Sequence, residues 1–418
     1  MSRRHLVRGE VRAIARGGDA VVETQSGVVL VPGPLPGERV ELELTSSKRG
    51  AARGRLERVL EASPMRREPP CPVASRCGGC PLMSARPELQ REVKLGFLVE
   101  ACRGLPGADA TDVEWIESPA DLGYRRRARL AWHGEAMGYR TFHSKRVVDI
   151  DECLVLAEPL RAAWNEARAC LASFLRGAGE IQLHLTGPNR AVVSLETQDE
   201  QPSGLYDACD SLSKRPPIAG VTLRTSGSGL PASWGDPHVV VETESGPVHG
   251  PAGSFFQAND RVNPHLVRAV VDLAEPDGLR VLELHSGVGN FTLELAARAG
   301  ALVAVEQDPR AVEACRANLE RRGLEGRVTV GDANRPPKGR FDVVVLDPPR
   351  QGARALFEDS SLLPGPKRVV YVSCDTATLS RDLRFATAKG YRIDRIIGFD
   401  MFPQTAHLES IVRLVRSR

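Results

Sequence analysis

The hydrophobic positions of this chain follow three different patterns along its length. In residues 5–62, short runs of alternating apolar and polar residues, clearest at 20–22, 28–31 and 40–44, are separated by Gly and Pro. Alternation with a period of two is typical of strands buried on one face, so this region predicts a small antiparallel β-barrel. Such barrels often bind nucleic acid, but the fold alone does not assign a function.

The middle of the chain mixes two periodicities. Residues 89–103 predict an amphipathic helix, and a second helical pattern covers 158–175. Strand-like segments surround the second helix at 128–132, 181–185, 191–196, 220–224 and 239–244. This mixed order indicates an α+β middle domain.

From residue 251 onward, strands and helices alternate regularly. The apolar runs at 281–284, 302–306, 328–330, 341–346 and 369–373 are typical of buried parallel strands, and 393–399 and 407–414 would complete the sheet. We therefore predict a multidomain α/β protein whose last domain is a doubly wound, Rossmann-like sheet. The predicted domains span 1–63, 64–250 and 251–418.

Length and composition support this division and narrow the choice of compartment and partner. A chain of 418 residues is too long for one ordinary core. No apolar run reaches the length of a membrane span and the start lacks a secretory pattern, so we expect a cytoplasmic protein without a membrane partner.

The distribution of charge says more than the net charge of +3. Residues 1–70 hold thirteen Lys or Arg and nine Asp or Glu, and Arg125, Arg126, Arg127 and Arg129 form a basic knot. Basic clusters supply affinity for phosphates, although a solvated surface charge run explains either cluster equally well when it is taken alone.

The cysteines suggest a metal centre. Their number, nine, is odd and no secretory signal precedes them, which argues against a disulfide framework. Cys71, Cys77 and Cys80 are spaced C-x5-C-x2-C, and three thiolates suit an iron–sulfur cluster or zinc. Cys153 is the best candidate for the fourth ligand.

The first strands of the last domain carry a nucleotide-binding pattern. Glycines at 287 and 289 follow the first strand, where they allow a ligand to approach the backbone at a helix N-terminus. Glu306 ends the next strand, where it can bind ribose hydroxyls, and Asp332 ends the third, where it can accept from an adenine amino group. The full six-residue glycine fingerprint of NAD sites is missing, which favours S-adenosylmethionine.

The later strand ends carry reactive groups. Residues 347–350 read Asp-Pro-Pro-Arg, a stiff turn that can line a pocket. Cys374 follows the strand at 369–373, between the small polar residues Ser373 and Asp375, and Glu409 lies near the start of the last segment. A thiol and a carboxylate at neighbouring strand ends suggest covalent catalysis with a separate base, whereas a buried cysteine in this position is otherwise inert.

Together these features resemble the RNA 5-methyluridine methyltransferase family, and more closely its iron–sulfur branch, which modifies uridine in 23S ribosomal RNA. The resemblance covers nearly the whole chain. It includes a TRAM-type barrel, the C-x5-C-G-G-C pattern, and the runs at 123–127, 253–257, 347–350, 373–375 and 407–409. The sequence departs from the family at 285–287, where His-Ser-Gly replaces an aromatic-Cys-Gly run.

The resemblance implies a role for each group. Cys374 would add to carbon 6 of uracil, and Glu409 would remove the proton from carbon 5 after methyl transfer. Cys71, Cys77, Cys80 and Cys153 would hold a 4Fe-4S cluster. The residues expected around S-adenosylmethionine and the target base are Gln257, His285, Asn290, Glu306 and Asp347, with Asp332 at the adenine.

Two alternatives remain at this point. The first is the same reaction on a transfer RNA uridine, although the presence of both the barrel and the cysteine pattern favours ribosomal RNA. The second is an RNA-binding protein with an inactive methyltransferase domain, against which Cys374 and Glu409 argue. No obligate protein partner is evident from the sequence.

Overall fold

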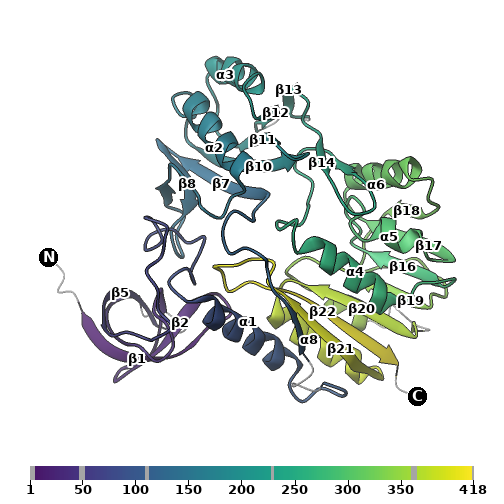
Figure 1. The fold of residues 1–418 in the computed structure, drawn as a ribbon, viewed down its shortest axis with the longest axis horizontal. Helices are drawn as coiled ribbons and strands as arrows, with labels where there is room; N and C mark the ends of the chain where they lie inside the picture. Colours follow the sequence, from purple (N-terminus) through teal and green to yellow (C-terminus); the bar gives the residue numbers. More distant parts are fainter. Residues whose placement is uncertain (1–4, 47–51, 109–112, 227–229, 359–364, 417–418) are drawn as a thin grey trace.

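The structure, a computed structural model, describes the whole chain except residues 1–4, 47–51, 109–112, 227–229, 359–364 and 417–418. Its described strands form a closed barrel, a seven-stranded sheet, an eight-stranded sheet and a two-stranded ribbon. Figure 1 shows the barrel near the N-terminus at one end of the molecule and the eight-stranded sheet at the other. The multidomain α/β architecture expected from the sequence is confirmed.

The N-terminal barrel contains five strands in the order β1-β2-β3-β5-β4. These are β1 (Leu6–Ile14), β2 (Asp19–Thr24), β3 (Gly27–Pro32), β4 (Arg39–Ser46) and β5 (Ala52–Glu61). The three expected strands fall within β2, β3 and β4. Their alternate residues, among them Val22, Val31 and Leu42, are buried inside the barrel, which explains the period of two.

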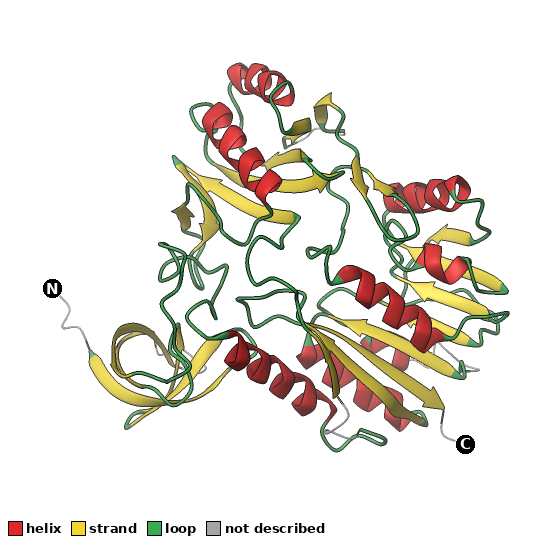
Figure 2. Cartoon of the chain, viewed as in Figure 1, coloured by secondary structure: helices red, strands yellow, loops and turns green. Residues whose placement is uncertain are grey.

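The central sheet has the order β13-β12-β11-β10-β7-β8-β9 and is mixed, because β11 and β12 are parallel while the other pairs are antiparallel. Its strands are β7 (Arg127–His133), β8 (Ala136–Arg140), β9 (Val147–Asp149), β10 (Ala178–Thr186), β11 (Arg190–Thr197), β12 (Ile218–Arg224) and β13 (Ala232–Gly235). Helices α2 (Glu158–Leu171) and α3 (Ser203–Ser213) pack on one face of it (Figure 2). The α+β prediction for this region is correct.

The C-terminal unit is built on the eight-stranded sheet, in the order β18-β17-β16-β19-β20-β22-β21-β6. Its strands are β6 (Val113–Ile116), β16 (Arg280–Leu284), β17 (Ala301–Glu306), β18 (Arg327–Val330), β19 (Val343–Leu346), β20 (Arg368–Ser373), β21 (Tyr391–Phe399) and β22 (Glu409–Arg416). Its helices are α4 (Asn263–Ala274), α5 (Thr292–Ala296), α6 (Pro309–Arg321), α7 (Arg354–Glu358) and α8 (Thr376–Ala388). The strands from β18 to β20 are parallel, and β22 is antiparallel to β20 and β21.

Helices cover both faces of this sheet, which is why its strands read as continuous apolar runs. On β19, Val343 and Val345 pack in the core that contains α4, whereas Val344 and Leu346 pack against α7 and α8. Three strand starts in this sheet differ from the prediction by two residues. The strand expected at 341 begins at Val343, the strand expected at 393 begins at Tyr391, and the strand expected at 407 begins at Glu409.

The segment between the barrel and the central sheet contributes to the C-terminal unit. Helix α1 (Pro87–Cys102) packs against α8, and β6 (Val113–Ile116) pairs in parallel with β21 at the edge of the eight-stranded sheet. The ribbon of β14 (Val239–Val241) and β15 (Val248–Gly250) packs against α6. Among the helices that the structure describes, we find none long and apolar enough to cross a membrane.

Candidate active site

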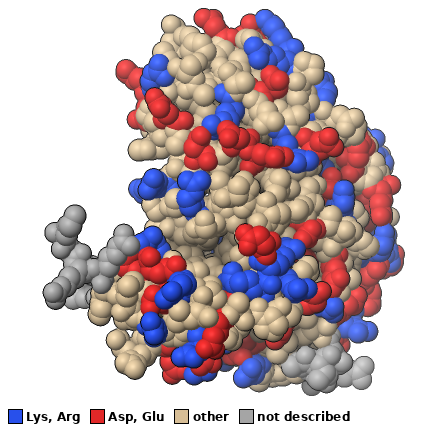
Figure 3. Space-filling model, turned by 60° about the vertical axis from the view of Figure 1, so that its left-hand side comes forward, with Lys and Arg blue, Asp and Glu red and all other residues tan. Residues whose placement is uncertain are grey.

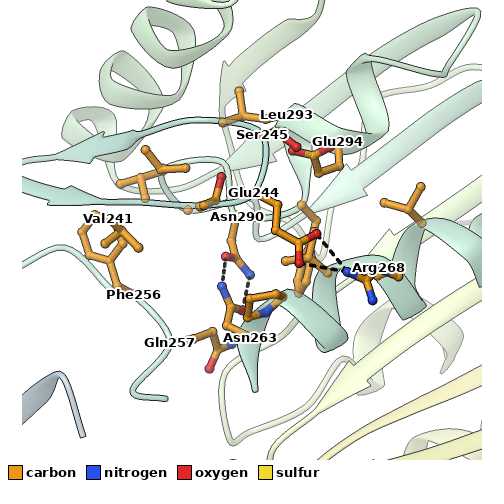
Figure 4. Close-up of a pocket in the computed structure, with 18 of the residues that line it drawn as sticks. Val241, Glu244, Ser245, Phe256, Gln257, Asn263, Arg268, Asn290, Leu293 and Glu294 are labelled. Carbon is orange, nitrogen blue, oxygen red and sulfur yellow. Dashed lines mark hydrogen bonds and ion pairs between the residues drawn. The ribbon is translucent and has the colours of Figure 1, made fainter. Parts of the chain in front are cut away.

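A cavity of about 290 Å³ opens at the carboxyl ends of β16 and β19. Gln257, His285, Asn290 and Asp347, all expected at the cofactor site, line it. Figure 4 shows that its walls come from the β14–β15 ribbon, from the chain leading into α4 and from the turn after β16. The structure therefore brings together residues from segments that are more than 100 positions apart.

The floor of the cavity is held by a pair of amides. The side chains of Asn263 and Asn290 exchange two hydrogen bonds, of 2.9 and 3.2 Å (Figure 4). By contrast, Oε1 of Gln257 and Oγ of Ser286 are buried and have no hydrogen-bond partner among the described residues. Buried polar atoms without partners are costly unless a ligand satisfies them, so both atoms are suited to contacting a bound molecule.

The turn after β16 needs unusual backbone conformations. His285, Gly287 and Gly289 have φ values of 63°, 55° and 108°. The positive φ at position 289 favours glycine, and a Cβ there would lie 3.2 Å from Sγ of Cys315, which is a tight contact. His285 also donates its backbone N–H to the Val305 carbonyl at 2.9 Å, which fixes the turn through its main chain.

Glu306 and Asp332 are placed differently from the other expected cofactor residues, because neither is among those that line the cavity. Glu306 accepts hydrogen bonds from the backbone N–H groups of Gly287, at 3.0 Å, and of Gln307 and Asp308. Asp332 accepts from Asn334. Both carboxylates oppose the effect of burial on His285, whose pKa is lowered mainly by desolvation. Their contact with a cofactor stays a prediction.

The predicted nucleophile and base meet at a second place on the same edge of the sheet, which we call the catalytic corner. Cys374 follows the last residue of β20, and Glu409 is the first residue of β22. Ser373 pairs with Ser410 in the antiparallel ladder, and Oγ of Ser410 donates to the Ser373 carbonyl at 3.0 Å. Antiparallel pairing places the end of one strand beside the start of the next, so the two reactive side chains become neighbours.

Acidic groups dominate the electrostatics of the catalytic corner. The pKa of the Cys374 thiol is raised to about 12, by burial first and then by Glu409 and Asp347, while Arg350 opposes the shift. Burial raises the pKa of Asp347 to about 7, and burial together with Asp347 raises the pKa of Glu409 well above its ordinary value. The resting cysteine is therefore a thiol, and Arg350 supplies positive charge that favours its ionised form.

Two groups in this region were not identified from the sequence. Glu283, on β16, is 1% exposed, and neither of its carboxylate oxygens has a hydrogen-bond partner among the described residues. Its pKa is raised to about 8, mainly by burial, although the Thr292 hydroxyl opposes the shift. Asn263 was also missed. The signal for Glu283 was a charged residue inside an apolar strand, and the signal for Asn263 was an Asn-Pro pair at the start of a helix.

Cys71, Cys77, Cys80 and Cys153 surround a second buried region, which we call the cysteine pocket. Cys71, Cys80 and Cys153 pack against Met83, Tyr124 and Val155. Burial raises the pKa of Cys77, Cys80 and Cys153, and neighbouring cysteines add to each shift. Oη of Tyr139 and Nε of Arg125 lie in this pocket without a hydrogen-bond partner among the described residues. No group of three or more described His, Cys, Asp or Glu side chains has an arrangement that could hold a metal ion.

The basic knot is only partly open to a ligand. Arg126 is 6% exposed and donates to the Leu185 carbonyl, and the guanidinium of Arg127 lies 4.8 Å from the centre of the Phe255 ring. Arg129 is exposed and paired with Glu180. Protein contacts therefore account for much of this cluster.

A groove between the barrel and the central unit offers another basic surface. Its volume is about 1200 Å³, and Arg53, Arg55, Arg66, Arg76 and Arg146 are among the residues that line it. Arg76 and Arg146 have no ion-pair partner among the described residues. Figure 3 shows that acidic and basic side chains are interspersed on the face it presents.

Comparison with known proteins gives matches to two family models. Residues 264–359 match the methyltransferase small domain, and residues 338–417 match the tRNA (uracil-5-)-methyltransferase family. The second match contains Asp347, Cys374 and Glu409.

Curated relatives match over almost the full length. The chain is 36% identical to the 23S rRNA (uracil(1939)-C(5))-methyltransferase RlmD of Pectobacterium atrosepticum, with 94% of this chain and 90% of the relative covered. It is 35% identical to the protein of the same name from Salmonella paratyphi A, over 99% of this chain and 97% of the relative.

A solved structure shares the whole architecture. It is the crystal structure of Pyrococcus abyssi tRNA (uracil-54, C5)-methyltransferase in complex with S-adenosyl-L-homocysteine, with a TM-score of 0.76 and 26% identity. The match covers 98% of this chain and 99% of that one.

Proposed function

The chain belongs to the RNA (uracil-5-)-methyltransferase family, and from this premise we propose that it methylates carbon 5 of a uridine in 23S ribosomal RNA. The observation that carries the proposal is the pairing of Ser373 with Ser410, which makes Cys374 and Glu409 neighbours at the catalytic corner. The ribosomal substrate is supported by full-length relatives named for that reaction.

The proposed mechanism uses Cys374 as the nucleophile. Carbon 5 of uracil is a poor nucleophile until a thiolate saturates the neighbouring double bond. Attack on carbon 6 forms a carbon–sulfur bond and moves an electron pair to carbon 5. That pair would bond to the methyl group as the bond from the methyl group to the sulfonium sulfur breaks, with S-adenosylhomocysteine as the leaving group. The raised pKa of the resting Cys374 thiol means that the thiolate must be stabilised by positive charge. Arg350 supplies such a charge and lowers that pKa.

Glu409 acts as the base that completes the reaction. It accepts the proton from carbon 5, the electron pair re-forms the double bond between carbons 5 and 6, and the Cys374 thiolate leaves. A carboxylate with a raised pKa is a stronger base than an exposed one, and Glu409 is 2% exposed. Its oxygen Oε1 has no hydrogen-bond partner among the described residues and is therefore free to take this proton.

The cavity beside the catalytic corner fits S-adenosylmethionine. The partnerless oxygens of Gln257 and Ser286 and the amide pair of Asn263 and Asn290 would orient the ligand, and Asp347 lies between the cavity and the corner. We assign Glu306 to the ribose and Asp332 to the adenine. When bound, S-adenosylmethionine supplies the methyl group as an electrophile.

The donor chemistry of the cysteine pocket, and not the arrangement of its side chains, supports a 4Fe-4S cluster. Cys71, Cys77, Cys80 and Cys153 offer four free thiols in one buried region. The partnerless Oη of Tyr139 and Nε of Arg125 could donate to the sulfur atoms of a cluster. A bound cluster would supply iron–thiolate bonds that join residues 71–80 to residue 153.

The proposed division of labour follows the predicted domains 1–63, 64–250 and 251–418. The TRAM-like barrel and the basic groove, with Arg76 and Arg146 free of ion pairs among the described residues, would hold RNA phosphates while the target base leaves its stack. The methyltransferase unit would then receive the base at the catalytic corner.

The test is methylation of defined RNA. The purified chain, S-adenosylmethionine with a labelled methyl group, and either 23S ribosomal RNA or transfer RNA are incubated, and the nucleosides are identified by mass spectrometry. We expect 5-methyluridine in the ribosomal RNA only. Product in transfer RNA alone would assign the transfer RNA reaction instead, and no product with either RNA would favour an inactive RNA-binding protein.

A further inference from the structure

The loop at residues 400–408, which joins β21 to β22, begins and ends beside the proposed base. Phe399 and Glu409 are the last paired residues of the two strands, so the loop opens at Glu409 itself. In Figure 1 this yellow loop extends from the sheet toward the dark blue segment before α1. Its position therefore bears directly on the catalytic corner.

Gln404, at the tip of this loop, is bonded entirely to residues from the front half of the chain. It is 0% exposed and its φ is 70°. Its backbone N–H donates to Oε1 of Gln90 at 2.8 Å, and its carbonyl accepts from the Leu82 N–H at 3.0 Å. Both partners lie more than 300 positions upstream.

The side chain of Gln404 makes the same kind of contact. Its Oε1 accepts from Nε2 of Gln90 at 3.0 Å and from Arg67 at 2.9 Å, and its Nε2 donates to the carboxylate of Asp121 at 3.0 Å. A residue in an unfavourable left-handed conformation with every polar group satisfied is held by its surroundings, not by local preference.

Other front-half residues hold the rest of the loop. Lys94 is 0% exposed, and its Nζ donates to the Asp400 carboxylate at 2.6 Å and to the Phe402 carbonyl at 3.0 Å. The Tyr124 hydroxyl donates to the Pro403 carbonyl at 3.0 Å. Ala406 packs in the barrel core cluster. The loop is thus the place where the barrel, the segment that follows Cys80 and the eight-stranded sheet meet.

The supporting residues adjoin the cysteine pocket. Leu82 follows Cys80 by two positions, and Tyr124 is part of the same buried cluster as Cys80. The guanidinium of Arg125, which also lies in that pocket, is 5.9 Å from the centre of the Phe402 ring. Phe402 in turn contacts His407 edge to face, with ring centres 6.4 Å apart.

We propose that Gln404 is a positioning residue. Through its bonds to Leu82, which adjoins the cysteine pocket, and to Gln90 of α1, it fixes the 400–408 loop and hence the approach of Glu409 to carbon 5 of the uracil. This inference rests on the proposed function and deepens it, because it gives the front half a role in the proton-removal step. Gln404 acts through the loop and does not touch the reacting atoms.

The test is a kinetic isotope effect measured with the full-length chain. Ribosomal RNA is prepared with hydrogen or deuterium at carbon 5 of its uridines, and kcat is compared. In Gln404→Asn the shorter amide tolerates the left-handed backbone but cannot reach Gln90, Arg67 and Asp121. We expect kcat to fall roughly 10- to 100-fold. The isotope effect on kcat should rise, because proton removal becomes limiting, and kcat/KM should change little, because the slowed step follows methyl transfer.

A second variant and a control separate positioning from folding. Gln90→Leu removes both hydrogen bonds between Gln90 and Gln404, together with the bonds from Gln90 to the Leu82 and Ala85 carbonyls, and should raise the isotope effect as well. Tyr371→Phe removes a buried hydrogen bond of 2.8 Å to Asp382 that lies wholly within the C-terminal unit. The control should lower the melting temperature without changing the isotope effect.

The outcomes distinguish this inference from the proposed function. If the unchanged chain forms no 5-methyluridine, the proposed function fails. If it is active and both Gln404→Asn and Gln90→Leu retain its isotope effect, only the positioning role is overturned. An isotope effect that rises equally in Tyr371→Phe would also overturn it, because general destabilisation would then suffice.

Discussion

The cofactor cavity and the catalytic corner lie at the same edge of one sheet, yet they are assembled in different ways. Much of the cavity comes from the turn after β16 and the start of α4, where Asn290 and Asn263 are 27 positions apart. The corner joins β20 to β22 and leads into a loop held by Gln90, 314 positions from Gln404. The comparison teaches that the turn and helix start at a binding cavity can be encoded within a short stretch of sequence, while the loop beside the reactive groups is held by distant segments.

The substitution with the largest expected effect is at Cys374, and it should stop the reaction at the catalytic corner while leaving cofactor binding in the cavity intact. Cys374→Ser should lower methylation at least roughly 10³-fold, because the hydroxyl cannot replace the thiolate that adds to carbon 6. Binding of S-adenosyl-L-homocysteine, measured by calorimetry, should be unchanged. A comparable loss of cofactor affinity would show that the two sites are not independent.

Glu409→Gln tests the second reactive group of the corner. The methyl group should still be transferred, but the proton of carbon 5 should remain, so that an RNA–protein adduct accumulates on a denaturing gel. Turnover should fall by roughly 10²- to 10⁴-fold, the usual contribution of a general base. Free methylated RNA released at the original rate would remove Glu409 from this role.

Asn290→Ala tests the cavity side of the comparison. Losing the amide pair leaves the Asn263 side chain without its partner, and a buried unsatisfied amide costs about 1–3 kcal/mol. We expect the Kd for S-adenosyl-L-homocysteine to rise roughly tenfold or more. The rate at saturating cofactor should stay close to that of the unchanged chain, and a fall in that rate with constant Kd would contradict the assignment.

Glu283→Gln should have a smaller effect, visible in stability against pH. The folded-state pKa of Glu283 is raised from 4.5 to about 8, so the folded protein holds a proton that the unfolded chain releases. Its contribution to stability is therefore lost as pH rises from 4.5 toward 8. The melting temperature of the variant relative to the unchanged chain should increase across that range and level off above it. A constant difference would mean that Glu283 does not titrate there.

Local patterns predicted much of the fold. Strands with a period of two in the barrel and continuous apolar strands in the C-terminal unit were found where expected, because both patterns follow from burial on one face or on two. The start of β22 was misplaced by two residues. Residues 407 and 408 belong to the loop, whose path is set by contacts from outside the sheet.

The sequence by itself determined the chemical groups, since the motifs around Cys374, Asp347 and Gly289 are contiguous and each follows an apolar strand. Only the tertiary structure decided that Glu283 is buried without a hydrogen bond, that β6 pairs with β21, and that Gln404 is held by Gln90. The physical reason is that periodicity reports how each segment is buried, whereas contacts between segments far apart in the chain depend on topology and packing, which no local pattern records.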